Sequence, residues 1–225
     1  MTLEEYFGDW LEVIDVPALN KVVTEVNRLY RTKLVVPEYN DIFKAFTLVS
    51  EHDCKVVFLG QDPYPQKGVA TGVLFGNKEG TTELSPSLEV IKEACINYEI
   101  PHEPIKFDVT LESWARQGIL MINSALTCEM NRVNSHTMLW RPFISKLLYN
   151  LSHRETGLIY VLFGEKAQTF EPYINKNLNS VIKISHPAYY ARTQTKMPHW
   201  VFTEINQLLM DKYGIPIKWY DKLLT

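Results

Sequence analysis

The sequence predicts an α/β fold, one domain in which a central four-stranded parallel sheet is flanked by helices. Short apolar segments alternate along the chain with stretches whose apolar residues recur at helical spacing. This alternation is typical of right-handed strand–helix–strand crossovers, which build a parallel sheet covered on both faces. The apolar segments are short enough for buried strands, and three of them are rich in Val or Ile. They span residues 55–59, 118–122, 158–163 and 181–184.

Helices are predicted before, between and after these strands. In the N-terminal third, apolar side chains recur at helical spacing. They are Leu19, Val22, Val23, Val26, Leu29 and Tyr30. Further helical patterns cover residues 87–98, 111–116 and 137–151 between the strands, and residues 201–213 after the last one.

Length and composition indicate an ordinary globular chain. Its 225 residues are enough for one large domain spanning 1–225, and 46% are hydrophobic and 22% charged. No apolar run approaches the roughly 20 residues of a membrane span, and Met1–Glu5 does not begin a signal peptide. Cys54, Cys95 and Cys128 lack the spacing of a metal site or a disulfide framework. We therefore expect reduced thiols, no membrane association and a cytoplasmic location, with a nuclear or viral setting left open.

The charge distribution is uneven although the net charge is only −3. Residues 172–203 contain no Asp or Glu, and this stretch predicts one face suited to a polyanion. A chance gap in acidic residues is the alternative. Its basic and imidazole side chains are Lys176, Lys183, Arg192, Lys196, His186 and His199.

Polar residues follow the predicted strands where each one ends. Asp62 follows the first strand, Asn123 the second and His186 the fourth, while Gly164-Glu165 follows the third. Parallel strands place their carboxyl ends at one edge of the sheet, where open α/β folds bind ligands. An acid, an amide and an imidazole are therefore expected to converge in one site.

The first strand end also has a restricted backbone. Pro63 fixes its own backbone and biases Asp62 away from helix, so the residues at this strand end are held in one geometry. Asp-Pro after a strand is also common turn chemistry, and the dipeptide alone does not distinguish a catalyst from a turn former.

The motifs around these residues resemble those of the family 1 uracil-DNA glycosylases over nearly the whole chain. The run Gly-Gln-Asp-Pro-Tyr matches the water-activating loop of that family, Gly-x-x-Phe its pocket phenylalanine, and Pro-Ser-Leu its phosphate-contacting loop. A Glu-Ser-Trp-Ala-x-Gln-Gly segment leads to the uracil-reading asparagine, and a His-Pro pair stands near the end. In this sequence these motifs stand, in the order just given, at residues 60–64, 72–75, 86–88 and 112–118, at Asn123, and at His186-Pro187.

The resemblance implies a uracil pocket made by Gln61, Tyr64, Phe75 and Asn123. Phe75 would stack on a uracil flipped out of the DNA, and the Asn123 amide would hydrogen-bond its Watson–Crick edge with both a donor and an acceptor. Tyr64 would press against uracil C5 and exclude the methyl group of thymine. Ordinary core packing is the competing interpretation of the two aromatic residues, and their motif positions argue against it.

The resemblance also implies a catalytic pair, with no metal and no cofactor. His186 would donate a hydrogen bond to uracil O2 as negative charge develops there. Asp62 would stabilise the sugar cation and position the attacking water. Only this carboxylate matches the catalytic set of the family, so the two-acid scheme of ordinary glycosidases is not the template. The contexts of Glu165 and Asp53 do not support a second acid.

On the DNA side, the sequence departs from the family at several positions. Pro65 stands where the family usually has His, Glu165 replaces a serine that would face a phosphate, and Tyr190 takes the place of the leucine wedge. The DNA-contacting residues implied by the resemblance are Pro86, Ser87, Gly164, Glu165, Ser185, Tyr190 and Arg192. The expected partners are single- and double-stranded uracil-containing DNA and DNA-mimic inhibitor proteins, and the expected state is a monomer.

Two other classes of protein compete with this interpretation. A nucleotide-binding or metal-dependent α/β hydrolase is disfavoured, because the sequence has neither a Gly-rich phosphate loop nor metal-ligand spacing. A glycosylase-fold scaffold that has lost catalysis is disfavoured by the presence of both Asp62 and His186.

Overall fold

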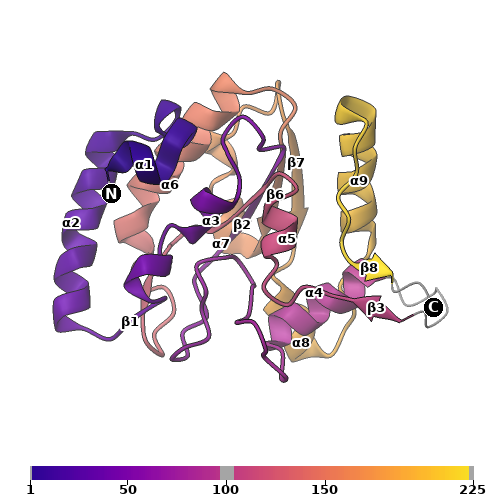
Figure 1. Ribbon diagram of the computed structural model, residues 1–225, viewed down its shortest axis with the longest axis horizontal. Helices are drawn as coiled ribbons and strands as arrows, with labels where there is room; N and C mark the ends of the chain where they lie inside the picture. Colours follow the sequence, from indigo (N-terminus) through magenta and orange to yellow (C-terminus); the bar gives the residue numbers. More distant parts are fainter. Residues whose placement is uncertain (1, 97–103, 223–225) are drawn as a thin grey trace.

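The central sheet of the protein has four parallel strands in the order β4-β2-β6-β7 (Figure 1). The computed structural model describes residues 2–96 and 104–222. The predicted four-stranded parallel sheet is confirmed, and each strand begins and ends within one residue of its predicted limits. The strands are β2 (Val56–Gly60), β4 (Ile119–Asn123), β6 (Ile159–Phe163) and β7 (Ser180–Ile184).

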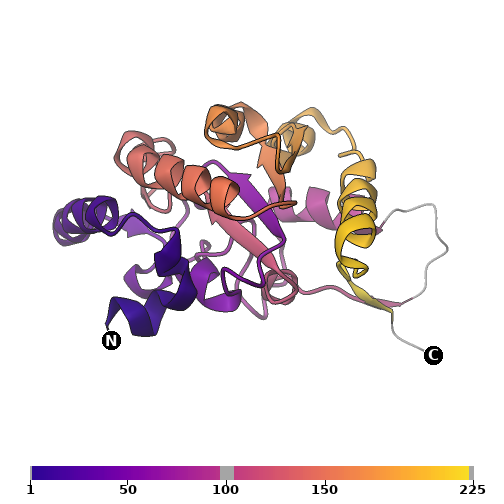
Figure 2. The same ribbon diagram turned by 90° about the horizontal axis from the view of Figure 1, so that it is seen from above.

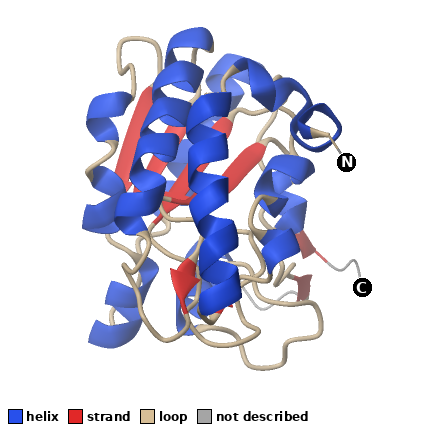
Figure 3. Cartoon of the chain, turned by 90° about the vertical axis from the view of Figure 1, so that its left-hand side faces the viewer, coloured by secondary structure: helices blue, strands red, loops and turns tan. Residues whose placement is uncertain are grey.

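Alternate residues of the strands pack on opposite faces of the sheet. Val57 and Leu59 of β2 contribute to one core cluster, whereas Val56 and Phe58 contribute to the other. This alternation follows from the two-residue period of a strand. Helices therefore cover both faces, as Figures 2 and 3 show.

The two faces are covered by different helices. The cluster that contains Val57 is completed by α1 (Leu3–Phe7), α2 (Val16–Thr32), α3 (Lys44–Leu48), α6 (Thr137–Arg154) and α7 (Gly164–Gln168). The cluster that contains Val56 is completed by α4 (Pro86–Ile96), α5 (Glu112–Ala115) and α9 (Trp200–Tyr213).

The long helices lie where the sequence predicts them. The helical pattern of the N-terminal third corresponds to α2, which begins after Asp15, whose carboxylate accepts a hydrogen bond from the Ala18 N–H. The patterns predicted at 111–116, 137–151 and 201–213 correspond to α5, α6 and α9. The pattern predicted at 87–98 corresponds to α4, and its last two residues lie outside the described residues.

Two segments that were expected to be loops or turns, after β6 and after β7, are helical, and the predicted phosphate-contacting loop at 86–88 coincides with the start of the helix predicted at 87–98. Residues 86–88 form the first turn of α4, Gly164 begins α7, and the residues after His186 form α8 (Pro187–Thr193). Proline suits the first position of a helix because the amide hydrogen it lacks would have no partner there. Pro86, Ser87, Gly164 and Glu165 therefore lie at helix N-termini, whereas Tyr190 and Arg192 lie in the second half of α8.

Several short elements were not predicted. Two antiparallel pairs lie outside the main sheet, β1 (Val35–Val36) with β5 (Cys128–Glu129), and β3 (Ile105–Lys106) with β8 (Asp221–Lys222). Three 3-10 helices span Gly8–Glu12, Tyr39–Asp41 and Glu171–Tyr173.

The structure also tests two expectations from composition. Cys54, Cys95 and Cys128 are buried free thiols, as predicted. Within residues 2–96 and 104–222, no helix has the length and apolar character needed to cross a membrane.

Candidate active site

A cavity of about 410 Å³ lies beyond the carboxyl ends of the strands. Asp62, Asn123 and His186 line it, although they are far apart in the sequence. The expected convergence of acid, amide and imidazole is therefore observed. Gln61, Tyr64 and Phe75 line the same cavity, so all six residues predicted for uracil binding and catalysis meet there.

The two oxygens of Asp62 differ in their surroundings. Oδ2 accepts hydrogen bonds from the backbone N–H of Asn134 at 2.9 Å and from Gln61 Nε2 at 3.1 Å. Oδ1 is buried and has no hydrogen-bond partner in the described chain. Burial raises the pKa of the Asp62 carboxyl, and the hydrogen bonds from Asn134 and Gln61 oppose that rise. Oδ1 is thus the oxygen of this carboxylate that no hydrogen-bond donor of the described chain occupies.

His186 is held as a neutral imidazole with a defined tautomer. It precedes α8, and its Nδ1 accepts a hydrogen bond from the backbone N–H of Ala188 at 3.2 Å. An accepting Nδ1 carries no proton, so the proton of the neutral ring is on Nε2. Burial lowers the pKa of His186 to about 4, because the charged ring would lose its hydration.

Gly164 makes room for this imidazole. Its backbone is left-handed, with φ of 84°, and a Cβ atom at this position would lie 2.8 Å from Cβ of His186. Any other residue would be strained and would displace the histidine. The position that sequence analysis assigned to DNA contact therefore also shapes the cavity wall.

Phe75 forms an aromatic wall beside His186. The two rings meet edge to face with centroids 5.4 Å apart, and Phe163 packs on Phe75 at 5.2 Å. Phe75 has a left-handed backbone, with φ of 62°, which is unusual for a bulky residue. The hydroxyl of Tyr64 donates a hydrogen bond to the Phe75 carbonyl at 3.1 Å, so the two aromatic residues are held together.

Asn123 is the last residue of β4 and pairs with Gly60, the last residue of β2. A Cβ atom on Gly60 would lie 2.8 Å from Oδ1 of Asn123. The missing side chain thus leaves space for the amide. Oδ1 of Asn123 is buried without a hydrogen-bond partner in the described chain, so this amide has unused hydrogen-bonding capacity at the cavity.

The candidate DNA-contacting residues are arranged around this cavity in two groups. Ser87 and Arg192 line the cavity itself. Pro86, Glu165 and Ser185 are exposed, and none of the three lines it.

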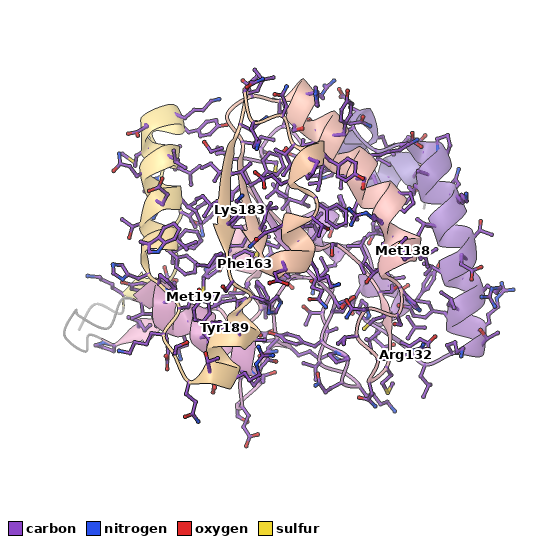
Figure 4. The ribbon with its side chains drawn as sticks, turned by 180° about the vertical axis from the view of Figure 1, so that it is seen from behind. Arg132, Met138, Phe163, Lys183, Tyr189 and Met197 are labelled. Atoms are coloured by element: carbon purple, nitrogen blue, oxygen red, sulfur yellow. The ribbon has the colours of Figure 1, made fainter. Side chains whose placement is uncertain are left out.

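The two tyrosines of α8 lie in different surroundings. Tyr190 is half-buried and packs against the core cluster of α4, α5 and α9, whereas Tyr189 is 46% exposed. Their rings meet edge to face at 5.4 Å, and Arg192 lies 6.0 Å from the centre of the Tyr189 ring. Figure 4 shows Tyr189 on the short helix below Phe163.

The basic stretch 172–203 is partly neutralised by an acidic residue just before it. Lys176 and Lys183 each form an ion pair with Glu171, at 3.0 Å. Among the described residues, Arg192 and Lys196 have no acidic partner within ion-pair distance. Within this stretch, the positive charge available to a polyanion is thus that of Arg192 in α8 and of Lys196 just after it.

Two contacts at the site were missed by sequence analysis. Asn134 bonds Asp62 through its backbone, and its side-chain oxygen accepts a hydrogen bond from Gln61 Nε2 at 2.9 Å. The buried Thr127 hydroxyl is hydrogen-bonded to His136 Nδ1 and to Trp140 Nε1, both at 2.8 Å. The residue type of Asn134 gave no signal for its bond to Asp62, because that bond is made by a backbone N–H.

One group of side chains in the described part of the chain has its ligand atoms close enough to share a metal ion. It comprises Asp9, Glu51 and His52, all of which precede β2, and none of them lines the cavity. Arg154 also lies beside Glu51.

A parallel sheet with a polar, aromatic-walled cavity beyond its carboxyl edge defines an α/β enzyme. The family model described as the Uracil DNA glycosylase superfamily matches residues 46–210. The chain belongs to this superfamily and is an enzyme that acts on N-glycosyl bonds.

Named relatives extend over almost the whole chain. The uracil-DNA glycosylase of Brevibacillus brevis is 30% identical over 219 residues, covering 94% of this chain and 93% of the relative. That of Campylobacter jejuni is 32% identical over 218 residues, covering 94% and 92%.

Solved structures support the fold. Mimivirus uracil-DNA glycosylase is 23% identical, with a TM-score of 0.75 over 97% of this chain and 93% of its own. A variant of mimivirus UNG in complex with UGI is 24% identical, with a TM-score of 0.78 over 90% of this chain and 82% of its own.

Proposed function

We propose that this protein hydrolyses the N-glycosidic bond of deoxyuridine in DNA, releases free uracil and leaves an abasic site. The observation that carries the proposal is that Gln61, Asp62, Tyr64, Phe75, Asn123 and His186 line one cavity. The product would be the starting point of base excision repair. The reaction needs no metal or cofactor in this scheme.

The cavity would accept a uracil that has been flipped out of the DNA. The Phe75 ring offers a flat surface for stacking. The Asn123 amide offers a donor and an acceptor to the Watson–Crick edge, and its buried Oδ1 has no competing partner in the described chain. Tyr64, held by its hydrogen bond to the Phe75 carbonyl, would clash with a methyl group on C5. The pocket would therefore select uracil over thymine.

His186 and Asp62 would act on opposite charges in the transition state. As the bond between uracil N1 and sugar C1′ breaks, the electron pair leaves with uracil, and Nε2–H of His186 donates to uracil O2. The carboxylate of Asp62 stabilises the positive sugar. Its free Oδ1 orients a water molecule, whose oxygen bonds to C1′ while its proton passes to Oδ1, and the uracil anion takes up a proton from solvent after release.

The DNA strand would cross the face that contains α8 and the start of α4. Arg192 and Ser87 lie at the cavity, and the exposed residues Pro86 and Ser185 would extend this surface. Glu165 places a carboxylate there and would weaken binding to phosphates. Tyr190 would fill the gap that the flipped base leaves in the stack.

The same surface would bind DNA-mimic inhibitor proteins, since an inhibitor that imitates the DNA backbone would meet the same groups. The support is the solved complex of a mimivirus UNG variant with UGI. We further propose that the protein is a cytoplasmic monomer.

Uracil release is the direct test. The protein is incubated with single-stranded and duplex oligonucleotides that contain one uracil, in the presence of a chelator, and free uracil is measured. Thymine-containing oligonucleotides of the same sequence are the control. Release of uracil alone supports the proposal. No release from either uracil substrate at high protein concentration contradicts it and favours a non-catalytic scaffold.

A further inference from the structure

We infer that Asn134 is a positioning residue for the carboxylate of Asp62. This inference rests on the proposed role of Asp62 in catalysis. Asn134 lies in the segment between β5 and α6, 72 positions from Asp62 along the chain. It acts on the carboxylate through its backbone N–H and on Gln61 through its side chain.

The hydrogen bonds around Asp62 fix which oxygen remains available. The Asn134 N–H and Gln61 Nε2 both donate to Oδ2. Gln61 Nε2 also donates to the side-chain oxygen of Asn134, so the three residues form a closed triangle. Oδ2 has two donors, and Oδ1 has none in the described chain. Without these hydrogen bonds the Asp62 carboxylate could rotate, and Oδ1 would no longer be held in one direction.

The backbone of Asn134 must be left-handed to aim its N–H at Asp62. Its φ is 64°, a conformation that Asn and Gly tolerate and that β-branched residues adopt only under strain. The residue type at this position is therefore explained by the direction of the N–H. Its side chain is exposed, so core packing does not explain it.

Contacts of the two residues that follow Asn134 anchor the segment. Ser135 Oγ accepts a hydrogen bond from the Glu129 N–H at 2.7 Å. His136 is buried and hydrogen-bonded to Thr127, which also accepts from Trp140. The hydrogen bonds of these neighbours hold the turn in place, so the N–H of Asn134 has a fixed direction. A positioning group requires such a fixed direction.

A matched control lies three residues away. Asn131 is also exposed and left-handed, with φ of 58°, but its N–H donates to the carbonyl of Pro65 and not to Asp62. Valine at either position imposes the same kind of backbone strain. Asn131→Val therefore measures what backbone strain in this segment does to the rate. Asn134→Val imposes the same strain, and it also turns the N–H at position 134 away from Asp62.

The experiment compares wild type with Asn134→Val, Asn134→Gly and Asn131→Val. Single-turnover uracil release and thermal unfolding are measured for each protein. Loss of a hydrogen bond to a charged group predicts a rate about 10- to 100-fold lower for Asn134→Val. Asn134→Gly keeps the backbone N–H and its direction, so its rate should fall by less than about 10-fold. Asn131→Val should match Asn134→Val in melting temperature and the wild type in rate.

The pH dependence of the rate is a second readout. His136, Lys166 and Cys128 are the other charged or titratable groups coupled to Asp62, and all three are unchanged in these variants. Removing a donor from the carboxylate favours its protonated form, so the acid limb of the Asn134→Val profile should move to higher pH. Asn131→Val should leave that limb unchanged.

The outcomes separate this inference from the proposed function. If wild type releases no uracil, the proposed function fails, and this inference fails with it. If wild type is active but Asn134→Val and Asn131→Val have equal rates and equal acid limbs, the function stands and Asn134 is not a positioning residue. A rate for Asn134→Gly as low as that for Asn134→Val would also overturn the inference, because the glycine keeps the backbone donor.

Discussion

The backbone N–H of Ala188 donates a hydrogen bond to Nδ1 of His186 across 3.2 Å. The bond comes from the first turn of α8, and it leaves the imidazole proton on Nε2. Burial acts in the same direction, because it lowers the pKa of His186 to about 4 and keeps the ring uncharged at neutral pH.

The first prediction concerns the protonation of this histidine. Nitrogen NMR should show the proton on Nε2 at pH 7 and ring protonation only near pH 4. Comparison with His186→Ala assigns the signals. A ring that is half protonated near the ordinary value of about 6.5 would show that the imidazole is not protected from water.

The second prediction concerns Asp62→Asn. Cleavage should slow by about 10²–10³-fold, because one preorganised charge-stabilising group is lost. The same change should raise the melting temperature at pH 7.5. The pKa of Asp62 is higher in the folded protein than in the unfolded chain, so its buried charge destabilises the fold at neutral pH.

The pH dependence of the gain in melting temperature is the control for the second prediction. The gain should shrink as the pH falls and disappear below the unfolded pKa of about 3.9, where wild-type Asp62 is neutral in both states. Asp211→Asn, an exposed change on α9, should show neither the gain nor the loss of rate. A melting temperature for Asp62→Asn below that of wild type at pH 7.5 would contradict the expected sign.

The third prediction concerns thymine exclusion. Tyr64→Ala removes the ring that would clash with a C5 methyl group, so this variant should release thymine from DNA above the wild-type background. Tyr64→Phe is the matched control. It loses only the hydroxyl that bonds the Phe75 carbonyl, and it should still reject thymine. Thymine release by Tyr64→Ala at the wild-type level would remove Tyr64 from the discrimination step.

The fourth prediction concerns the wedge. Base flipping costs a few kcal/mol in duplex DNA and least in a single strand, whereas aromatic stacking is worth about 1–3 kcal/mol per base. Tyr190→Ala should therefore lose more activity on duplex than on single-stranded substrate, and Tyr190→Leu should keep much of the duplex activity. Because Tyr190 is half-buried, rates are compared with melting temperatures.

Tyr189→Ala is the companion variant, since Tyr189 is the more exposed ring of the pair. Equal losses on both substrates for Tyr190→Ala would exclude it as the wedge. A loss specific to duplex for Tyr189→Ala would then assign that role to Tyr189.

The fifth prediction concerns the exposed carboxylate at the start of α7. Glu165→Ser should tighten binding to uncleaved DNA, measured in the Asp62→Asn background. The gain should be largest at low salt, where the repulsion between Glu165 and phosphates is least screened. Glu4→Ser removes an equal charge from α1 and should have little effect. Equal gains for both changes would indicate a general effect of net charge.

The sheet and the cavity could be predicted from the sequence because their signals are local. Each buried strand is a short apolar run, and a parallel sheet brings the carboxyl ends of its strands to one edge. Asp62, Asn123 and His186 could therefore be placed together without knowledge of their contacts. The strand order and the pairing of Gly60 with Asn123 needed the structure.

The short elements and the backbone contacts of the site could not be predicted, because they leave no local pattern in the sequence. Helices α7 and α8 have five and seven residues, which is too short for apolar periodicity to be recognised. The two-residue strands carry no alternation at all. Asn134 contacts Asp62 through a backbone N–H, a group that every residue except proline carries, so residue type could not reveal the bond. The pairing of Lys176 and Lys183 with Glu171 depends on how the 3-10 helix before β7 folds back.

The strand order also has a consequence for how activity is acquired during folding. Asp62 follows β2, a central strand, whereas His186 follows β7, an edge strand that pairs only with β6 in the main sheet. Among the parallel pairings of the main sheet, β2 with β6 joins the segments that lie farthest apart along the chain, and β6 with β7 joins those that lie nearest. Because long loops close slowly, β6 and β7 should pair before β2 joins β6. Recovery of activity after denaturation therefore reports the step that joins β2 to β6, since that pairing brings Asp62 and His186 to the same edge of the sheet.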